Sequence, residues 1–143
     1  MQKRITISVR IAAILQLFTA ALHSVSFFVK PQPTNETEKQ FLDIMNTYSM
    51  DMGVGFSPTF GDLYLSMSIS FALLFLFGGI INLSLINLKV DNRILKTILG
   101  AGVIIFGIIF IVTVLLTFIM PVVCTGLVFL TLLLSWYITP RSS

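Results

Sequence analysis

Long uncharged stretches separated by short polar segments are the main pattern of this chain. They run over residues 11–29, 63–88 and 97–140. A helix that crosses a bilayer needs roughly 20 apolar residues, so each of the first two stretches fits one crossing. The third would be roughly 66 Å long as a helix, which is enough for two crossings. The pattern predicts an all-α, four-helix transmembrane bundle in one membrane domain, with helices at about 8–30, 62–88, 94–118 and 121–138.

Pro121 divides the third uncharged stretch. Proline has no backbone N–H and disrupts the interior of a helix. We therefore expect a tight turn at 118–122, between the third and fourth spans.

The segment over residues 31–61 has the composition of a loop. Pro31 and Pro33 favour an end to the first helix, and Asn35 followed by Glu38 matches a helix-capping box. Apolar residues then recur at helical spacing, at Phe41, Ile44, Met45, Tyr48 and Met52. This spacing predicts a short amphipathic helix on the outer membrane surface or over the mouth of the bundle.

The rest of this loop is rich in glycine and proline, which indicates a turning segment and not a strand. Asp62 stands directly before the second apolar run, so we predict that it is the N-cap of that helix.

Composition supports lipid as the main solvent of the chain. Hydrophobic residues make up 56% and charged residues 10% of the sequence, whereas about 25% of a typical soluble domain is charged. The mean hydropathy is +0.98. A single cysteine, Cys124, excludes an internal disulfide and a thiolate zinc cage, and a single histidine excludes a multi-histidine metal site. We therefore predict no metal and no cofactor.

The positions of the basic residues predict the orientation of the spans. Seven of the nine basic residues fall on one side of the predicted bundle, at Lys3, Arg4, Arg10, Lys89, Arg93, Lys96 and Arg141. Cytoplasmic segments carry the excess of lysine and arginine. Both termini are therefore expected in the cytoplasm, in a multi-pass protein of the cytoplasmic membrane. These residues flank apolar spans and form no basic stripe, which favours the membrane surface over nucleic acid as their partner.

Polar side chains within the spans supply the candidate site. The first span carries Gln16, Thr19, His23 and Ser26 on one face, and the second carries Asp62, Ser66 and Ser70. In antiparallel helices His23 could meet Asp62 or Ser66, in a polar pocket that opens outward. The ligand-binding candidates are His23, Asp62, Gln16, Thr19 and Ser66. The alternative is that these groups only join helices by hydrogen bonds.

The remaining polar residues suggest local roles. Asn82 and Asn87, near the inner end of the second span, are expected to form local hydrogen bonds. Trp136 and Tyr137, just before the tail, match aromatic residues that anchor a helix at the membrane interface.

Several function classes remain open. The sequence favours a non-enzymatic protein with a structural, assembly or sensing role in the envelope, with lipid and a second copy or another membrane protein as candidate partners. A small lipid- or substrate-binding protein, or an enzyme, would use His23 and Asp62 as its polar pair. A proton-coupled transporter is disfavoured, because no carboxylate lies well inside a predicted span.

The sequence also resembles an uncharacterised family of small bacterial four-helix membrane proteins. The residues that carry the resemblance are Leu22-His23-Ser24, late in the first span, and the run Phe60-Gly61-Asp62-Leu63-Tyr64 at the start of the second. The chain departs from the family pattern at Leu22, where a glycine is typical. The resemblance implies four membrane helices and a bacterial envelope, and it implies no reaction.

Overall fold

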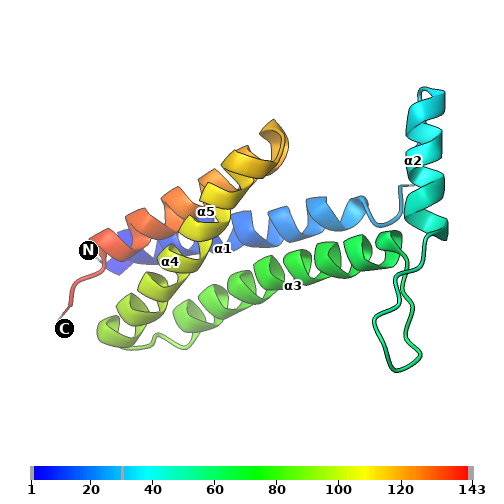
Figure 1. Cartoon of the computed structure of the whole chain (residues 1–143). Coiled ribbons are helices and arrows are strands. Elements are labelled where there is room, and N and C mark those ends of the chain that lie inside the picture. Colours follow the sequence, from blue (N-terminus) through cyan, green and yellow to red (C-terminus); the bar gives the residue numbers. More distant parts are fainter. Residues whose placement is uncertain (1, 30, 142–143) are drawn as a thin grey trace. The chain divides into compact units, whose positions relative to one another are not determined.

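A computed structural model describes residues 2–29 and 31–141, which contain five α-helices and no strand (Figure 1). The helices are α1 (Gln2–Val25), α2 (Glu36–Thr47), α3 (Phe60–Asn87), α4 (Asn92–Leu116) and α5 (Ile119–Ile138). All except α2 are long and apolar enough to cross a membrane. The predicted all-α class with four span-like helices is therefore confirmed.

The chain divides into two compact units. Unit 1 comprises Met1–Ala20 and Leu74–Ser143, and unit 2 comprises Ala21–Leu73. The division falls within α1 and within α3, so each of these helices contributes residues to both units.

In unit 1, α4 and α5 form an antiparallel hairpin. The Thr113 and Thr125 hydroxyls lie 2.8 Å apart near the closed end. A Cβ atom added to Gly107 would lie 3.1 Å from the Phe129 ring, so the missing side chain makes room for the aromatic residue. The contacting residues have higher numbers in α4 where they have lower numbers in α5, as Gly107 with Phe129 and Thr113 with Thr125 show. This is the contact pattern of neighbouring antiparallel helices.

The hairpin turns at Thr117 and Phe118, the two residues between the helices. The Thr117 amide and hydroxyl both donate to the Thr113 carbonyl, at 3.0 and 2.7 Å, and so satisfy the end of α4. The predicted turn at 118–122 is therefore shifted: it lies at 117–118, and residues 119–122, Pro121 included, already belong to α5. Pro121 lies in the first turn of α5, where a backbone N–H would have no helical acceptor and its absence costs nothing.

Parts of α1 and α3 complete the core of unit 1. The Ser8 and Ser135 hydroxyls are 2.7 Å apart and join α1 to α5. The Phe75 ring meets the Phe106 ring edge to face, with centroids 4.9 Å apart, and joins α3 to α4. The largest fully buried apolar side chains are Val9, Phe75, Leu99, Val128 and Leu132.

In unit 2, α1 ends five residues earlier than predicted. The Ser26 amide donates to the His23 carbonyl at 3.1 Å, and the Ser26 hydroxyl donates to the same oxygen at 2.6 Å. These bonds to the third preceding residue tighten the last turn and end the α-helix at Val25. The other end of α1 belongs to unit 1, and there the helix starts at Gln2 and not near residue 8. The basic residues of this segment are exposed, so the helix extends beyond the apolar span without burying their charges. Lys30 lies outside the described residues.

The start of α2 has one of the two hydrogen bonds of the predicted Asn35–Glu38 capping box, and a neighbouring residue replaces the other partner. The Glu38 amide donates to the Asn35 side chain at 2.8 Å. In return, the Glu38 carboxylate accepts the Thr34 amide at 2.6 Å and the Thr34 hydroxyl at 2.7 Å, one residue before the usual partner. These hydrogen bonds hold the pKa of Glu38 below its ordinary value, and the bond from the Thr34 hydroxyl contributes most to the lowering.

The loop between α2 and α3 folds back on itself, as its glycines and proline predict. The Met50 amide donates to the Pro58 carbonyl at 2.9 Å. Positive φ angles at Gly53, Val54 and Gly55 turn the chain at the tip. Within the described residues it contains an isolated bridge, between Ser49 and Thr59, and no strand.

The prediction that Asp62 is the N-cap of α3 is wrong. The helix begins at Phe60, so Thr59 takes the cap position. The Thr59 hydroxyl accepts the Asp62 amide at 3.1 Å, and the Asp62 carboxylate accepts the Thr59 amide at 2.9 Å. Asp62 is thus the acidic partner in a capping box.

Candidate functional site

The five candidate site residues fall in two compact units. Gln16 and Thr19 belong to unit 1, whereas His23, Asp62 and Ser66 belong to unit 2. The single helical face that was predicted for Gln16, Thr19 and His23 therefore contributes to two different packing environments.

Gln16 is fully buried and pairs with Asn82 of α3. The Asn82 Nδ2 donates to the Gln16 Oε1 at 2.8 Å, while the Gln16 Nε2 is buried and has no hydrogen-bond partner. A Cβ atom added to Gly78 would lie 2.5 Å from that Nε2, so this glycine makes the space for the amide. The expectation of a local bond for Asn82 is wrong, because its side chain reaches across to α1.

Thr19 uses its hydroxyl within its own helix. The hydroxyl donates to the Leu15 carbonyl at 2.8 Å, and the side chain is buried. A hydrogen bond of this kind, to a carbonyl one turn earlier, satisfies a hydroxyl in apolar surroundings without a partner from another helix.

His23 lies against aromatic rings. Its ring meets the edges of Phe27 and Phe71, with centroid distances of 5.6 and 5.1 Å. Its Nε2 is buried and has no hydrogen-bond partner. A buried polar nitrogen without a partner costs free energy, which makes this atom the most unusual polar group of unit 2.

The other two candidates lie nearer the start of α3. Asp62 is exposed and engaged with Thr59, as described above, and Ser66 is also exposed. Phe71, the ring next to His23, is roughly 13 Å further along α3 than Asp62. Among the described residues, no hydrogen bond or ion pair joins His23 to Asp62 or Ser66.

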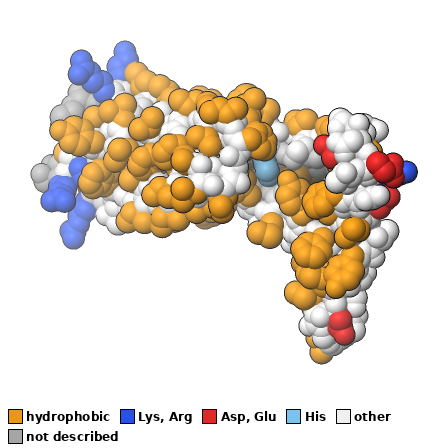
Figure 2. Space-filling view, turned by 45° about the horizontal axis from the view of Figure 1, so that its top comes forward, with side chains coloured by type: hydrophobic (Ala, Val, Ile, Leu, Met, Phe, Trp, Pro, Cys, Tyr) orange, Lys and Arg blue, Asp and Glu red, His pale blue; other side chains and the backbone are white. Residues whose placement is uncertain are grey.

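The basic residues form a second candidate region, which sequence reasoning used only for orientation. Figure 2 shows Lys and Arg side chains gathered at the end of unit 1 where α1 begins, beside sides covered by hydrophobic residues. The Lys96 ammonium donates to the Thr139 carbonyl at the end of α5 and lies 5.2 Å from the centre of the Trp136 ring. Lys96 thus joins the start of α4 to the end of α5 at this basic end.

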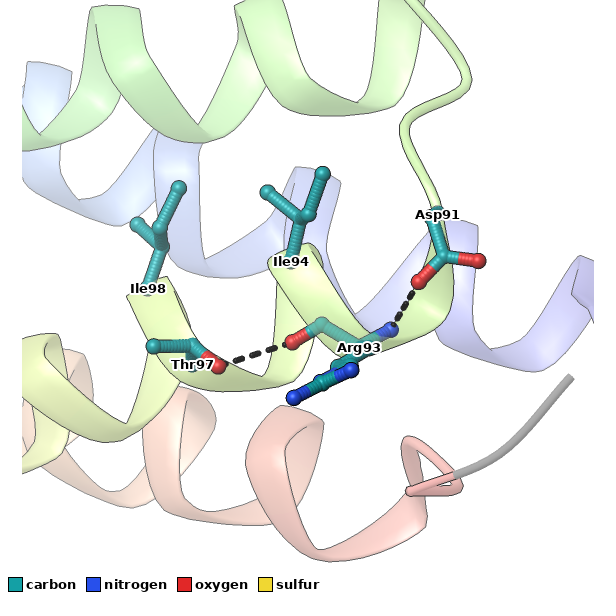
Figure 3. Close-up of a pocket in the computed structure, with 5 residues that line it drawn as sticks. All are labelled: Asp91, Arg93, Ile94, Thr97 and Ile98. Atoms are coloured by element: carbon teal, nitrogen blue, oxygen red, sulfur yellow. Dashed lines mark hydrogen bonds between the residues drawn. The ribbon is translucent and has the colours of Figure 1, made fainter.

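Two open cavities flank Arg93 in this region. One, of about 480 Å³, is lined by Asp91, Arg93, Ile94, Thr97 and Ile98 (Figure 3). There the Asp91 carboxylate accepts the Arg93 amide at 2.7 Å and caps α4. Ile94 and Ile98 project from one side of α4, while Arg93 and Thr97 lie on the other side. The other cavity, of about 540 Å³, lies between α4 and α5. We call it the α4–α5 groove.

Within the described residues, no three His, Cys, Asp or Glu side chains are grouped to hold a metal ion. Comparison of the chain with protein-family models, with curated proteins and with solved structures finds no match in any of the three.

Proposed function

We propose that this chain is a non-enzymatic, four-span protein of the cytoplasmic membrane that acts through assembly with other membrane components. Both termini would lie in the cytoplasm, and α2 would lie at the outer surface. The observation that carries the proposal is the separation of charge. Unit 1 contains seven of the nine basic residues and one acid, whereas unit 2 contains five of the six acids.

The basic end of unit 1 supports this orientation. It brings together the start of α1, the start of α4 and the end of α5, through the Ser8–Ser135 and Lys96–Thr139 hydrogen bonds. Basic residues at the ends of spans favour the cytoplasmic side.

The polar groups inside the span-like helices support a role in assembly and not in catalysis. Pairs that join helices among the described residues include Ser8 with Ser135, Gln16 with Asn82, and Thr113 with Thr125. Hydrogen bonds of this kind hold membrane helices together.

Exposed apolar side chains indicate where lipid or another chain would lie. On α2, Phe41 and Ile44 are exposed, as expected for a helix on a membrane surface. On α4, Ile104, Ile108 and Ile111 are exposed along one side. A second copy or another membrane protein could cover this side of α4.

Cysteine labelling in intact cells tests the orientation. In a Cys124→Ala background, we expect a membrane-impermeant maleimide to label Ser57→Cys in intact cells and Asn87→Cys only after permeabilisation. Both positions are exposed and uncharged, so neither substitution changes the charge balance. The opposite labelling pattern would overturn the orientation, and labelling of both sites in intact cells would overturn the four-span arrangement.

A second candidate function is supported by the unpartnered Nε2 of His23. This nitrogen, next to Phe27 and Phe71, could bind the polar group of a small lipid or substrate. A ligand site in unit 2 would thus use His23, with Asp62 as a more distant charge.

Substitution of His23 separates this function from packing. His23→Leu and His23→Gln should both fold, and only the glutamine variant keeps a polar group at this depth. Ligand binding, measured by native mass spectrometry of the protein purified in mild detergent, should be lost in the leucine variant. Unchanged co-purifying molecules in both variants would remove His23 as a ligand-binding residue.

A further inference from the structure

The α4–α5 groove combines positive charge with an apolar wall. Arg93 of α4 and Arg141, which follows α5, line it together with Lys96. Arg93 and Arg141 are exposed, so both guanidinium groups are accessible to a ligand. None of the described residues that line the groove is acidic. The groove is therefore complementary to a negatively charged group.

Lys96 and Trp136 fix the walls of the groove. Lys96 is held between the Thr139 carbonyl and the Trp136 ring, so its charge is already partly satisfied. A Cβ atom added to Gly100 would lie 3.0 Å from the Trp136 Nε1, and this glycine allows the indole to pack against α4. The two arginines are thus the groups available to bind an anion, and Lys96 and Trp136 position the groove between them.

The α4 residues that line the groove change from polar to apolar along one face of the helix. Arg93 and Thr97 are followed by Gly100 or Ala101 and then by Ile104, at the spacing of successive helical turns. This stripe extends roughly 16 Å along the helix. An amphiphile that lay in the groove would place its charged group at Arg93 and an acyl chain at Ala101 and Ile104.

We propose that the α4–α5 groove binds one anionic phospholipid from the leaflet at the basic end of unit 1. The phosphate lies between Arg93 and Arg141, because guanidinium groups donate paired hydrogen bonds to phosphate oxygens. One acyl chain lies along Ala101 and Ile104. Trp136 lies at the boundary between headgroup and chain, where tryptophan is favoured. This inference rests on the proposed membrane insertion of unit 1.

The groove favours a lipid over a soluble phosphate or a protein segment. A soluble anion would leave the apolar wall at Ala101 and Ile104 uncovered. An acidic peptide would have to place its polar backbone against the same wall, within the depth of the spans. A phospholipid satisfies the arginines and the wall together, and basic pockets between membrane helices are a known type of lipid site.

Trp136 provides the measurement, because it is the only tryptophan of the chain. The full-length protein is reconstituted in phosphatidylcholine vesicles that contain either brominated phosphatidylglycerol or brominated phosphatidylcholine, at the same mole fraction. Bromine on the acyl chain quenches tryptophan emission on contact. We expect a preference of about 25-fold for phosphatidylglycerol, about fivefold for each arginine.

Matched charge variants test the arginines. Arg93→Gln/Arg141→Gln should reduce the preference to about one, since both lipids then bind equally. Arg4→Gln/Arg10→Gln removes the same charge from α1, outside the groove, and should leave the preference unchanged. If both double variants lost the preference for phosphatidylglycerol equally, the preference would come from a diffuse surface potential, and the proposed site would be overturned.

A third variant tests the apolar wall without altering charge. Ala101 is exposed, so Ala101→Phe fills the groove without disturbing the core. It should reduce quenching by brominated phosphatidylglycerol to the level seen with brominated phosphatidylcholine. Retained preference in this variant would overturn the proposed path of the acyl chain.

The remaining outcomes distinguish binding of a lipid from binding of a soluble anion and from a protein that does not insert into the membrane. Excess glycerol phosphate in the buffer should not relieve quenching by brominated phosphatidylglycerol, and relief would identify a soluble phosphate site and overturn the lipid proposal. Equal quenching of the unaltered protein by both lipids would overturn the groove while leaving the membrane insertion intact. Quenching by neither lipid would overturn the insertion itself.

Discussion

Units 1 and 2 use their polar side chains in different ways. In unit 1, hydroxyl and amide groups join residues far apart in the sequence, such as Ser8 with Ser135. In unit 2, the hydrogen bonds of Thr34, Asn35 and Thr59 are local and satisfy the starts of helices. Unit 1 also has local caps, such as Asp91 at the start of α4. The contrast teaches that side-chain hydrogen bonds join helix partners in unit 1, whereas those cited in unit 2 act at helix boundaries.

Charge follows the same division. Unit 1 is basic and buries its core between apolar helices, whereas unit 2 is acidic and exposes the apolar face of α2. The side chains of α2 include none that is buried. Unit 1 therefore has a buried apolar core of its own, whereas the apolar side chains of α2 are not buried.

The largest effect is expected from added volume in unit 1. A Cβ atom at Gly79 would lie 2.7 Å from Leu17 and 3.1 Å from the Ala13 carbonyl. Gly79→Ala should lower the free energy of unfolding by about 1–3 kcal/mol, as overpacking does in other cores. Reversible unfolding in mixed detergent micelles measures the change.

Two other glycines serve as controls for Gly79. Gly102 has ordinary contact distances to Leu132, of 3.7 and 3.9 Å, so Gly102→Ala should be neutral or stabilising. In unit 2, the nearest neighbour of Gly61 is the exposed Asn46 side chain, which can move, so Gly61→Ala should cost less than Gly79→Ala. Equal costs at Gly79 and Gly61 would break the distinction between the two units.

A smaller effect is expected at the buried Gln16–Asn82 pair. Either single leucine substitution leaves the other amide without its partner, whereas the double substitution removes both polar groups. Each single change should therefore destabilise more than the double change. A double-mutant cycle should give a coupling of about 0.6 kcal/mol, the average for hydrogen bonds between membrane helices, and no more than about 1.7 kcal/mol. Strict additivity would mean that this pair does not specify the contact of α1 with α3.

Loss of the cap at Thr59 should affect unit 2 alone. Thr59→Ala removes the hydroxyl that accepts the Asp62 amide, and losses of such caps cost about 1 kcal/mol. Amide hydrogen exchange in the first turn of α3 should become faster, while exchange in α4 and α5 stays unchanged. Faster exchange throughout the chain would indicate that the cap supports both units.

The smallest effect is a pH dependence at the start of α2. The pKa of Glu38 is lowered in the folded chain, so the charged carboxylate stabilises the cap above the ordinary pKa of glutamate. This contribution is lost as the pH falls through the lowered folded pKa. Amide exchange at the start of α2, corrected for intrinsic rates, should lose protection in acid, and Glu38→Gln should remove this pH dependence. An unchanged acid response in Glu38→Gln would assign it to another group.

Hydrophobic patterning was sufficient to predict the number and type of the long helices, because lipid-length apolar runs leave few alternatives. It was insufficient for their ends, which depend on single hydrogen bonds. Ser26 ends α1, and Thr59 in place of Asp62 caps α3. Pro121 illustrates the same limit, since a proline in the first turn of a helix and one in a preceding turn look alike in sequence.

The candidate site was harder to predict, because contacts between helices depend on rotation about each helix axis. The sequence positions of Gln16 and Asn82 do not by themselves indicate that the two side chains pair. The position of Asp62 before an apolar run likewise does not indicate that its carboxylate accepts hydrogen bonds from the neighbouring Thr59. The groove residues Arg93 and Arg141 were placed on the same side by charge, and only the packing of α4 on α5 brings them together.

The short connection between α4 and α5 has a consequence for biosynthesis. Only Thr117 and Phe118 separate the two helices, and the connection carries no charged group. A chain that enters a bilayer from the basic end of unit 1 can therefore insert both helices together as a hairpin. Residues 97–140 contain no charged side chain. In such an insertion no charged group of this segment would cross the hydrocarbon layer, and the charges of Arg93 and Arg141 would stay on the side of entry.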